Sequence, residues 1–329
     1  MLSKTHMYKC FIDLSKAYDR VDRPLLWELL RRLGLPPHLV LLLENLHSGS
    51  TAVIFTPGCS TPSEKFDLER GLKQGSVLAP LLFNLFSGAM IKHWKSLLGN
   101  SQAGIRVVYN INSSPLDMSD HHGSQLNDNP HDPLFPGKRI RLQEILYADD
   151  CVIYAESEAQ LQQLVTAYNK AATDFGQQVS PSKSKVMVVQ SPEDELDPIP
   201  VVIRLAPTDQ ESLQVVKVFS YLGSLDSNDG NTANELDQRI ARIRGAYFRL
   251  QGRVFENNAL SLTPKLLLFF KMFIVPVALY GCATWDLTVK QMGLLDKTQY
   301  RLLRRILRLH VPAPEFPKQI SYIDLLDAA

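Results

Sequence analysis

The turn Tyr147-Ala148-Asp149-Asp150 and the apolar stretches on either side of it, residues 139–147 and 151–155, decide the fold of this chain. Both stretches contain β-branched and aromatic residues, and the pattern predicts two strands joined by a tight turn with two carboxylates at its tip. A third strand is predicted for residues 8–13 (Tyr-Lys-Cys-Phe-Ile-Asp), which also ends in a carboxylate. The sequence therefore places three aspartates at the ends of apolar strands: Asp13, Asp149 and Asp150.

Three carboxylates in such positions favour a cation site. An unpaired carboxylate beside an apolar strand is unfavourable, and clustered carboxylates repel one another. Oxygen ligands suit Mg²⁺, and two such ions can activate a 3′-hydroxyl and stabilise a departing pyrophosphate. Taken alone, however, an Asp-Asp pair in a turn is weak evidence, because most such pairs are simple turn residues.

The remaining pattern predicts an α+β lobe followed by a helical lobe. Pro80 begins a long apolar helix that runs to about Leu98, and Ser157 with Gln160 forms the capping box of another. Further strands are predicted at residues 185–189, 201–205 and 215–222. Thr232 and Glu235 form a second capping box, after which only helices are predicted. The expected organisation is one lobe over 1–230, with a solvated insertion at 110–137, a helical lobe over 231–310 and a tail over 311–329.

Composition excludes several classes of protein. The 329 residues are 45% hydrophobic and 21% charged, which indicates about two soluble domains and excludes a disordered or collagen-like chain. Four scattered cysteines predict neither a disulfide framework nor a thiolate zinc site, and fit a reducing compartment inside the cell, cytoplasm or nucleus. No signal peptide is visible at the start. Histidines 121, 122 and 131 of the insertion are expected to be solvent-exposed rather than metal ligands.

Charge is unevenly distributed along the chain. Residues 236–310 carry 13 Lys and Arg against 4 Asp and Glu, and the remainder carries 22 against 30. This asymmetry favours an acidic site on one lobe and a polyanion-binding surface on the other, with a solvated basic helix face as the alternative. The run Leu266–Ala283 is as long as a membrane span, but Lys271 lies inside it and Pro276 interrupts it, so we expect a buried helix.

Five motifs, in order along the chain, resemble those of reverse transcriptases. Residues 11–19 (FIDLSKAYD) are similar to motif A, residues 71–84 (GLKQGSVLAPLLFN) to motif B and residues 147–150 (YADD) to motif C. Phe175-Gly176 with Lys183-Ser184-Lys185 is similar to motif D, although Ser180 replaces the usual asparagine, and Tyr221-Leu222-Gly223-Ser224 is similar to motif E. The segment Leu279–Trp285 (LYGCATW) and the basic helix after it resemble the non-LTR retrotransposon polymerases of animals.

The resemblance implies a right-hand polymerase, with a palm (a sheet backed by helices) followed by an all-helical thumb. It implies RNA-directed DNA polymerase activity through two-metal nucleotidyl transfer, with Asp13, Asp149 and Asp150 as catalytic residues and ligands of two Mg²⁺ ions; Mn²⁺ is the alternative metal. Nucleotide-binding roles are implied for Tyr18, Gln74, Gly75 and Lys183. Among these, Tyr18 crowds a ribose 2′-hydroxyl and Lys183 donates a proton to pyrophosphate; a core tyrosine and a surface lysine are the alternatives.

The implied partners are an RNA template with a DNA primer, and deoxynucleoside triphosphates, with no membrane. The primer end is expected to contact the primer grip, formed by Tyr221, Leu222, Gly223 and Ser224. The basic thumb is expected to bind duplex phosphates through arginines of its helices: Arg242, Arg249, Arg301, Arg304, Arg305 and Arg308.

The chain departs from the family at its start, because only twelve residues precede Asp13, where the family has a fingers subdomain. We therefore expect an N-terminally truncated domain whose activity is lowered by the loss of residues that position the triphosphate. Three hypotheses stay open: a polymerase that works in this form or with fingers from another chain, an inactive remnant, and a non-catalytic nucleic-acid-binding module that uses the basic thumb. The oligomeric state is also open.

Overall fold

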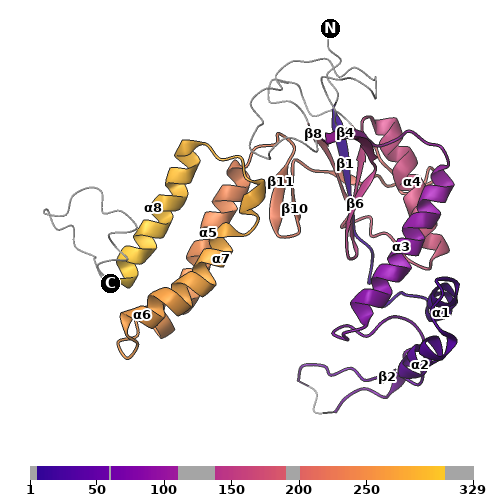
Figure 1. The fold of residues 1–329 in the computed structure, drawn as a ribbon, viewed down its shortest axis with the longest axis horizontal. Helices are drawn as coiled ribbons and strands as arrows, with labels where there is room; N and C mark the ends of the chain where they lie inside the picture. Colours follow the sequence, from indigo (N-terminus) through magenta and orange to yellow (C-terminus); the bar gives the residue numbers. More distant parts are fainter. Residues whose placement is uncertain (1–5, 59–60, 110–137, 190–200, 308–329) are drawn as a thin grey trace, which may run out of the picture. The chain divides into compact units, whose positions relative to one another are not determined.

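A computed structural model describes residues 6–58, 61–109, 138–189 and 201–307 (Figure 1). The chain divides into two compact units, Met1–Val216 and Lys217–Ala329. The division lies before the predicted boundary at residue 230 because the hairpin of β10 (Val218–Tyr221) and β11 (Ser224–Ser227) packs on helix α5 (Ala233–Leu250) of the second unit. The predicted insertion at 110–137 and the tail at 311–329 lie outside the described residues.

The first unit is built on a five-stranded sheet with the order β6-β7-β1-β8-β9. The central strand β1 (Met7–Ile12) is antiparallel to β7 (Asp150–Ala155) on one side and to β8 (Lys185–Val189) on the other. Strand β6 (Glu144–Tyr147) pairs antiparallel with β7, and the short β9 (Gln214–Val215) pairs parallel with β8. The predicted hairpin of β6 and β7, and the predicted strand before Asp13, are thus confirmed.

Two long helices supply the core of this unit. Helix α4 (Glu158–Asp174) packs on β1 and β7, and α3 (Ala79–Leu98) packs on α4. The buried Trp94 of α3 donates a hydrogen bond from Nε1 to the carbonyl of Leu164 at 3.0 Å and lies edge-on to Tyr168 of α4. Ser157 caps α4 by accepting from the backbone N–H of Gln160, but the Gln160 side chain accepts from the N–H of Glu156, so only half of the predicted capping box forms. These observations confirm the α+β class.

Two further helices and a small hairpin precede α3. Helix α1 (Arg23–Arg32) is capped by Asp22, whose carboxylate accepts from the N–H of Leu25. Helix α2 (Pro37–His47) follows, and then the short antiparallel pair β2 (Thr51–Ala52) and β3 (Phe66–Asp67). Of α2, only Val40 is fully buried.

The strand predicted at residues 201–205 is wrong. Val201, Ile203 and Leu205 of this apolar run are buried. The residues between them, however, bond to side chains of α4 rather than to a strand: the N–H of Arg204 donates to Gln162, and Gln162 donates back to the carbonyl of Arg204. The carbonyl of Ile203 accepts from the N–H of Leu213, which is in no strand. The apolar run at residues 201–205 thus indicated buried side chains, but not a backbone paired in the sheet.

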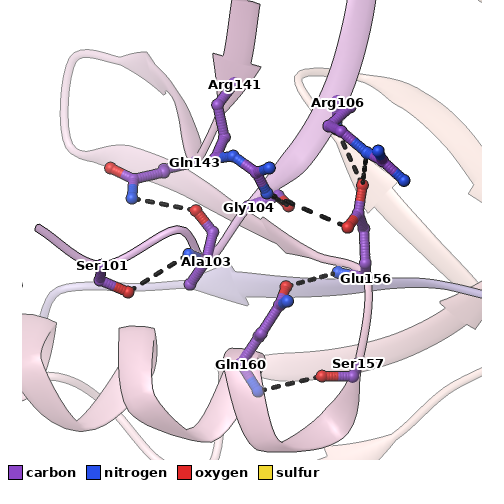
Figure 2. A network of polar contacts seen from close by, with 9 residues as sticks. All are labelled: Ser101, Ala103, Gly104, Arg106, Arg141, Gln143, Glu156, Ser157 and Gln160. Atoms are coloured by element: carbon purple, nitrogen blue, oxygen red, sulfur yellow. Dashed lines mark hydrogen bonds and ion pairs between the residues drawn. The ribbon is translucent and has the colours of Figure 1, made fainter. Parts of the chain in front are cut away.

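A hairpin of β4 (Ile105–Tyr109) and β5 (Lys138–Leu142) is fastened to the sheet and to α4 by the polar network of Figure 2. Arg106 donates from both its backbone N–H and its guanidinium to Glu156, at 3.1 and 3.3 Å. Arg141 donates to the carbonyl of Gly104, and the backbone N–H of Glu156 donates to Gln160 in the first turn of α4. The base of the hairpin is thereby fixed to the end of β7.

In the second unit, the described residues from 233 to 307 are all helices and their connections. Helix α5 continues into the π-helical η1 (Gln251–Phe255). The helices that follow are α6 (Leu262–Pro264), the π-helical η2 (Lys265–Ile274), α7 (Val275–Leu279), the 3₁₀ helix η3 (Cys282–Thr284) and α8 (Val289–Ile306). The core of the unit includes a stacked pair, Tyr247 and Phe255.

The capping box predicted at the start of α5 is wrong. The hydroxyl of Thr232 donates instead to the carbonyl of Asp286, and the Glu235 carboxylate accepts from the N–H of Leu225. Both side chains are thus used for contacts with other segments. A capping box is present at α8, where Thr288 and Gln291 bond to each other's backbone.

The apolar run in this unit is only partly buried. Among the described residues, one helical segment, Leu262–Thr284, is long and apolar enough to cross a membrane. Its mean hydropathy is 2.1, and 19% of its apolar window of 18 residues is buried. Leu266, Phe270 and Ile274, four residues apart, face the core, whereas Met272 and Phe273 are exposed. The expectation of a buried helix therefore holds for one face.

Candidate active site

The strand register brings Asp13 and Asp150 to neighbouring positions. Ile12 of β1 pairs with Cys151 of β7, so the next pair in this antiparallel register is Asp13 and Asp150. Asp13 lies one residue beyond the end of β1, so this neighbourhood is an extension of the strand register; the effect of the Asp13 charge on the pKa of Asp150 agrees with it.

Asp149 lies in the two-residue turn next to them. Tyr147 pairs with Asp150, which leaves Ala148 and Asp149 as the turn residues. Ala148 has a φ of 56°, in the left-handed region that favours glycine, whereas Asp149 has no positive φ. A positive φ at the first position alone is the signature of a type II′ hairpin turn. An alanine in this conformation stores roughly 1 kcal/mol of strain.

Electrostatics link the three carboxylates. Burial raises the pKa of the Asp150 carboxyl, and the charges of Asp149 and then Asp13 raise it further. Burial also raises the pKa of the Tyr18 hydroxyl, with a further contribution from Asp149. The predicted nucleotide-binding Tyr18 therefore shares the electrostatic environment of the carboxylates.

The loop after α4 holds Asp13 through its backbone. The N–H of Asp13 donates to Oγ of Ser184 at 3.1 Å, and the N–H of Ser180 donates to the carbonyl of Asp13 at 2.8 Å. Lys183, in the same loop, places Nζ 3.5 Å from Oδ2 of Asp13. The structure thus brings together the segments that resemble motifs A and D, including the position where serine replaces the usual asparagine.

These residues fit a cation, although they do not enclose one. Among the residues that the structure describes, no three His, Cys, Asp or Glu side chains converge closely enough to hold a metal ion. Two observations nevertheless favour a positive ligand. Oδ2 of Asp13 is buried and accepts no hydrogen bond, and burial together with the negative charges of Asp149 and Asp13 raises the pKa of Asp150. Lys183, with 70% of its side chain exposed, supplies part of that charge from the surface.

The segment that resembles motif B packs on the one that resembles motif A. The Tyr18 ring stacks on Phe83 of α3, with ring centroids 4.4 Å apart. The N–H of Leu72 donates to the carbonyl of Tyr18, and that of Gly71 to the carbonyl of Val21. Gly71 has a φ of +83°, and a Cβ atom there would lie 2.6 Å from the carbonyl oxygen of Asp19. Only glycine fits this approach.

The two other residues predicted to bind nucleotide lie on an open loop. Gln74 and Gly75 are exposed, and a Cβ atom at Gly75 would meet no atom within 4 Å. Val77, just after them, is 94% exposed. The loop is thus free to contact a ligand.

Sequence reasoning missed Arg23, which fixes the base of this loop. Its guanidinium donates to the carbonyls of His47, Leu68 and Gly71, at 2.8, 2.6 and 2.8 Å. The signal that could have found it is an arginine in the first turn of a predicted helix. The carbonyls that it bonds lie outside the strands, where no strand pairing supplies a donor.

The predicted primer grip forms the hairpin β10–β11 of the second unit. Tyr221 pairs with Ser224, and the turn residues Leu222 and Gly223 have φ values of 49° and 82°. Positive φ at both positions is typical of a type I′ turn.

The arginines predicted to bind nucleic acid differ in their surroundings. Arg242 donates to the carbonyl of Gly223 at 2.7 Å, and Arg249 donates to the carbonyl of Gly245. On α8, Arg301 and Arg305 are exposed, Arg305 lies over the Phe248 ring, and Arg304 lies over the Tyr300 ring. Arg308 lies outside the described residues.

Comparison with known proteins assigns the chain to a family. Residues 2–224 match the family model "Reverse transcriptase (RNA-dependent DNA polymerase)". Over 100 residues the chain is 34% identical to the "Retrovirus-related Pol polyprotein from type-2 retrotransposable element R2DM" of Drosophila melanogaster, which covers 30% of this chain and 9% of that protein. Over 87 residues it is 37% identical to the "RNA-directed DNA polymerase from mobile element jockey" of Drosophila funebris, covering 26% and 9%.

A third relative matches almost the whole chain. The "Probable RNA-directed DNA polymerase from transposon X-element" of Drosophila melanogaster is 24% identical over 311 residues, which cover 92% of this chain and 28% of that protein. The chain therefore spans less than a third of the length of these relatives. Among solved structures, telomerase from Candida tropicalis in complex with a TWJ fragment of telomeric RNA aligns with a TM-score of 0.42 at 10% identity, over 99% of this chain and 42% of that one.

The family match runs over the segments that resemble motifs A to D and through Ser224, the last residue of the one that resembles motif E. The chain therefore belongs to the reverse transcriptase family, and its similarity is to the polymerases of non-LTR retrotransposons.

Proposed function

We propose that this chain carries the nucleotidyl-transfer centre of an RNA-directed DNA polymerase, with Asp13, Asp149 and Asp150 as its catalytic carboxylates. The observation that carries the proposal is the register of β1 and β7, which sets Asp13 opposite Asp150, with Asp149 in the adjoining turn. The charges of Asp149 and Asp13 both act on Asp150, and neighbouring like charges oppose one another unless a cation neutralises them.

These carboxylates would hold two Mg²⁺ ions, or Mn²⁺ as the alternative. When bound, the ions would lower the pKa of a primer 3′-hydroxyl and stabilise the charge of the departing pyrophosphate. Lys183 is an ammonium group beside Asp13 at the protein surface, where it can bind a triphosphate and give a proton to the leaving oxygen. Because Lys183 forms an ion pair with Asp13, this role is favoured over that of a surface lysine with no partner.

Tyr18 and the loop with Gln74 and Gly75 would bind the incoming deoxynucleotide. The Tyr18 ring is fixed by its stack on Phe83, and burial, with a further contribution from the charge of Asp149, raises the pKa of its hydroxyl. A fixed ring beside the carboxylates leaves little room for a ribose 2′-hydroxyl, which would favour deoxynucleotides. The open surface at Gly75 supports contact with the base pair.

A second candidate function is nucleic-acid binding without catalysis. The exposed Arg301 and Arg305 of α8, with the half-exposed Phe248 under Arg305, combine positive charge with an aromatic face. Such a combination suits phosphate and base contacts that tolerate many sequences.

Primer extension on an RNA template, with Mg²⁺ and deoxynucleotides, separates the two functions. Wild-type protein should extend the primer and the Asp149→Asn/Asp150→Asn variant should not, whereas Asp174→Asn, an exposed aspartate paired with His93, should match the wild type. If the folded protein binds primer–template in a salt-sensitive way but extends the primer with neither Mg²⁺ nor Mn²⁺, the result would instead favour nucleic-acid binding without catalysis. Absence of both activities would leave neither proposal standing.

A further inference from the structure

The turn of the hairpin β10–β11 receives hydrogen bonds from three side chains of other segments in the second unit. The Tyr280 hydroxyl donates to the carbonyl of Leu222 at 2.6 Å. The guanidinium groups of Arg242 and Arg239 both donate to the carbonyl of Gly223, at 2.7 and 3.2 Å. Both carbonyls of the two-residue turn are therefore bonded to groups outside the hairpin.

Arg239 is itself fixed by a buried ion pair. Its side chain is 2% exposed and pairs with Glu235, one helical turn earlier, which is 4% exposed. The second oxygen of Glu235 accepts from the N–H of Leu225 in β11 at 2.6 Å, and the Arg239 guanidinium lies over the Tyr280 ring at 5.2 Å. One charge pair thus connects α5, the hairpin and Tyr280.

The backbone of the hairpin also approaches the segment after α7 unusually closely. A Cβ atom at Gly223 would lie 3.2 Å from the Tyr280 ring, and one at Gly281 would lie 2.7 Å from Oγ of Ser224. Both glycines have positive φ, +82° and +75°. Each position therefore favours glycine for its conformation, and a side chain at Gly281 would also displace the Oγ of Ser224.

From these contacts we infer that Tyr280 and Arg239 are positioning residues: they fix the turn of the predicted primer grip so that the hairpin meets the primer end in one conformation. The inference gives a role to the segment Leu279–Trp285, which the sequence linked only to a family resemblance. It rests on the proposed function for the identity of the bound nucleic acid, but not for the support of the turn. Leu222, more than a third exposed, remains at the surface of the hairpin.

The test is Tyr280→Phe, which removes one hydroxyl and keeps the ring over Arg239 and Gly223. Loss of one such hydrogen bond should speed amide exchange of residues 218–227 roughly 3- to 10-fold. The KM for primer–template should rise by a similar factor, with the KM for deoxynucleotide unchanged. Tyr300→Phe, in the same unit and in contact with Arg304 through its ring, is the matched control and should change neither quantity.

A second pair of variants tests the close approach. Gly281→Ala should reproduce the faster exchange because its Cβ would collide with Ser224, and adding Ser224→Ala should restore part of the protection by removing Oγ. If the double variant exchanges as fast as Gly281→Ala alone, the contact between Gly281 and Ser224 does not stabilise the hairpin.

The outcomes for Tyr280→Phe are distinct. Faster exchange together with a raised KM supports the inference, whereas faster exchange with unchanged KM in an active protein overturns the positioning role. Unchanged exchange overturns the support itself. If the wild type neither extends nor binds primer–template, the proposed function fails, and the exchange data alone then decide whether Tyr280 holds the turn.

Discussion

Gly71→Ala tests the packing of the segment that resembles motif B against the one that resembles motif A. The new Cβ would lie 2.6 Å from the carbonyl oxygen and 2.7 Å from the Cα of Asp19, so backbone must move. A positive φ adds roughly 1 kcal/mol for alanine. Overpacking against a fixed neighbour adds roughly 1–3 kcal/mol. We therefore expect the free energy of unfolding to fall by about 2–4 kcal/mol.

Gly75→Ala is a matched control in the same loop. Its φ of +82° is nearly that of Gly71, but a Cβ there would meet nothing within 4 Å. Both variants thus carry the same cost of a positive φ, and only Gly71→Ala also brings a Cβ atom into the backbone of Asp19. The control should lose about 1 kcal/mol.

Urea unfolding followed by the fluorescence of Trp27 and Trp94, both buried in the first unit, measures the difference. With a denaturant dependence of about 2 kcal/mol per molar, the midpoint of Gly71→Ala should lie roughly 0.5–1.5 M below that of Gly75→Ala. Equal midpoints for the two variants would refute the close approach between Gly71 and Asp19.

Three further predictions concern the same unit. Arg23→Lys keeps the charge but cannot bond three carbonyls at once, so urea unfolding should show a loss of roughly 1–3 kcal/mol, and an unchanged midpoint would mean that Arg23 does not hold the loop. Ala148→Gly relieves a φ of 56° and should raise the melting temperature, by the equivalent of roughly 1 kcal/mol; a lower melting temperature would contradict the strained turn. Because burial and the charges of Asp149 and Asp13 raise the folded-state pKa of Asp150, its ionised form opposes folding. Metal-free protein should therefore gain stability as the pH falls through that raised pKa, and thermal melts of Asp150→Asn in a chelator should lack this gain.

Local sequence patterns predicted the elements that carry the carboxylates. Apolar runs with β-branched and aromatic residues beside Asp13 and Asp150 predicted buried strands, and the short gap at residues 148–150 predicted a hairpin. In the structure Asp150 joins the second strand, so the turn has two residues. The helices that begin near Pro80 and Ser157 were found for the same reason, since apolar spacing and caps act over a few residues. At Val201–Leu205, apolar side chains are buried although the backbone is not paired in a sheet. The apolar run there therefore predicted a strand that is absent.

Contacts between distant segments could not be predicted in this way. Asp13 and Ser184 are 171 positions apart, and nothing local to either indicates their hydrogen bond. Thr232 and Glu235 have the spacing of a capping box, but the carbonyl of Asp286 and the N–H of Leu225 compete for them once the chain is folded. Tertiary partners therefore decide between two uses of the same side chains.

The arrangement of the three carboxylates explains why their repulsion persists in the folded chain. Side chains can rotate, but the backbone of Asp13 is fixed by Ser180 and Ser184, and that of Asp150 by its pairing with Tyr147 of β6. The chain therefore cannot relieve the repulsion by separating the strands without breaking the sheet. A cation that binds here would reduce that repulsion, and its binding would not have to order a loop first. A charged site whose backbone is fixed in this way is preorganised for its ligand. The same reasoning makes the neutral variant Asp150→Asn more stable in metal-free protein, because burial and the charges of Asp149 and Asp13 oppose the ionised form of Asp150.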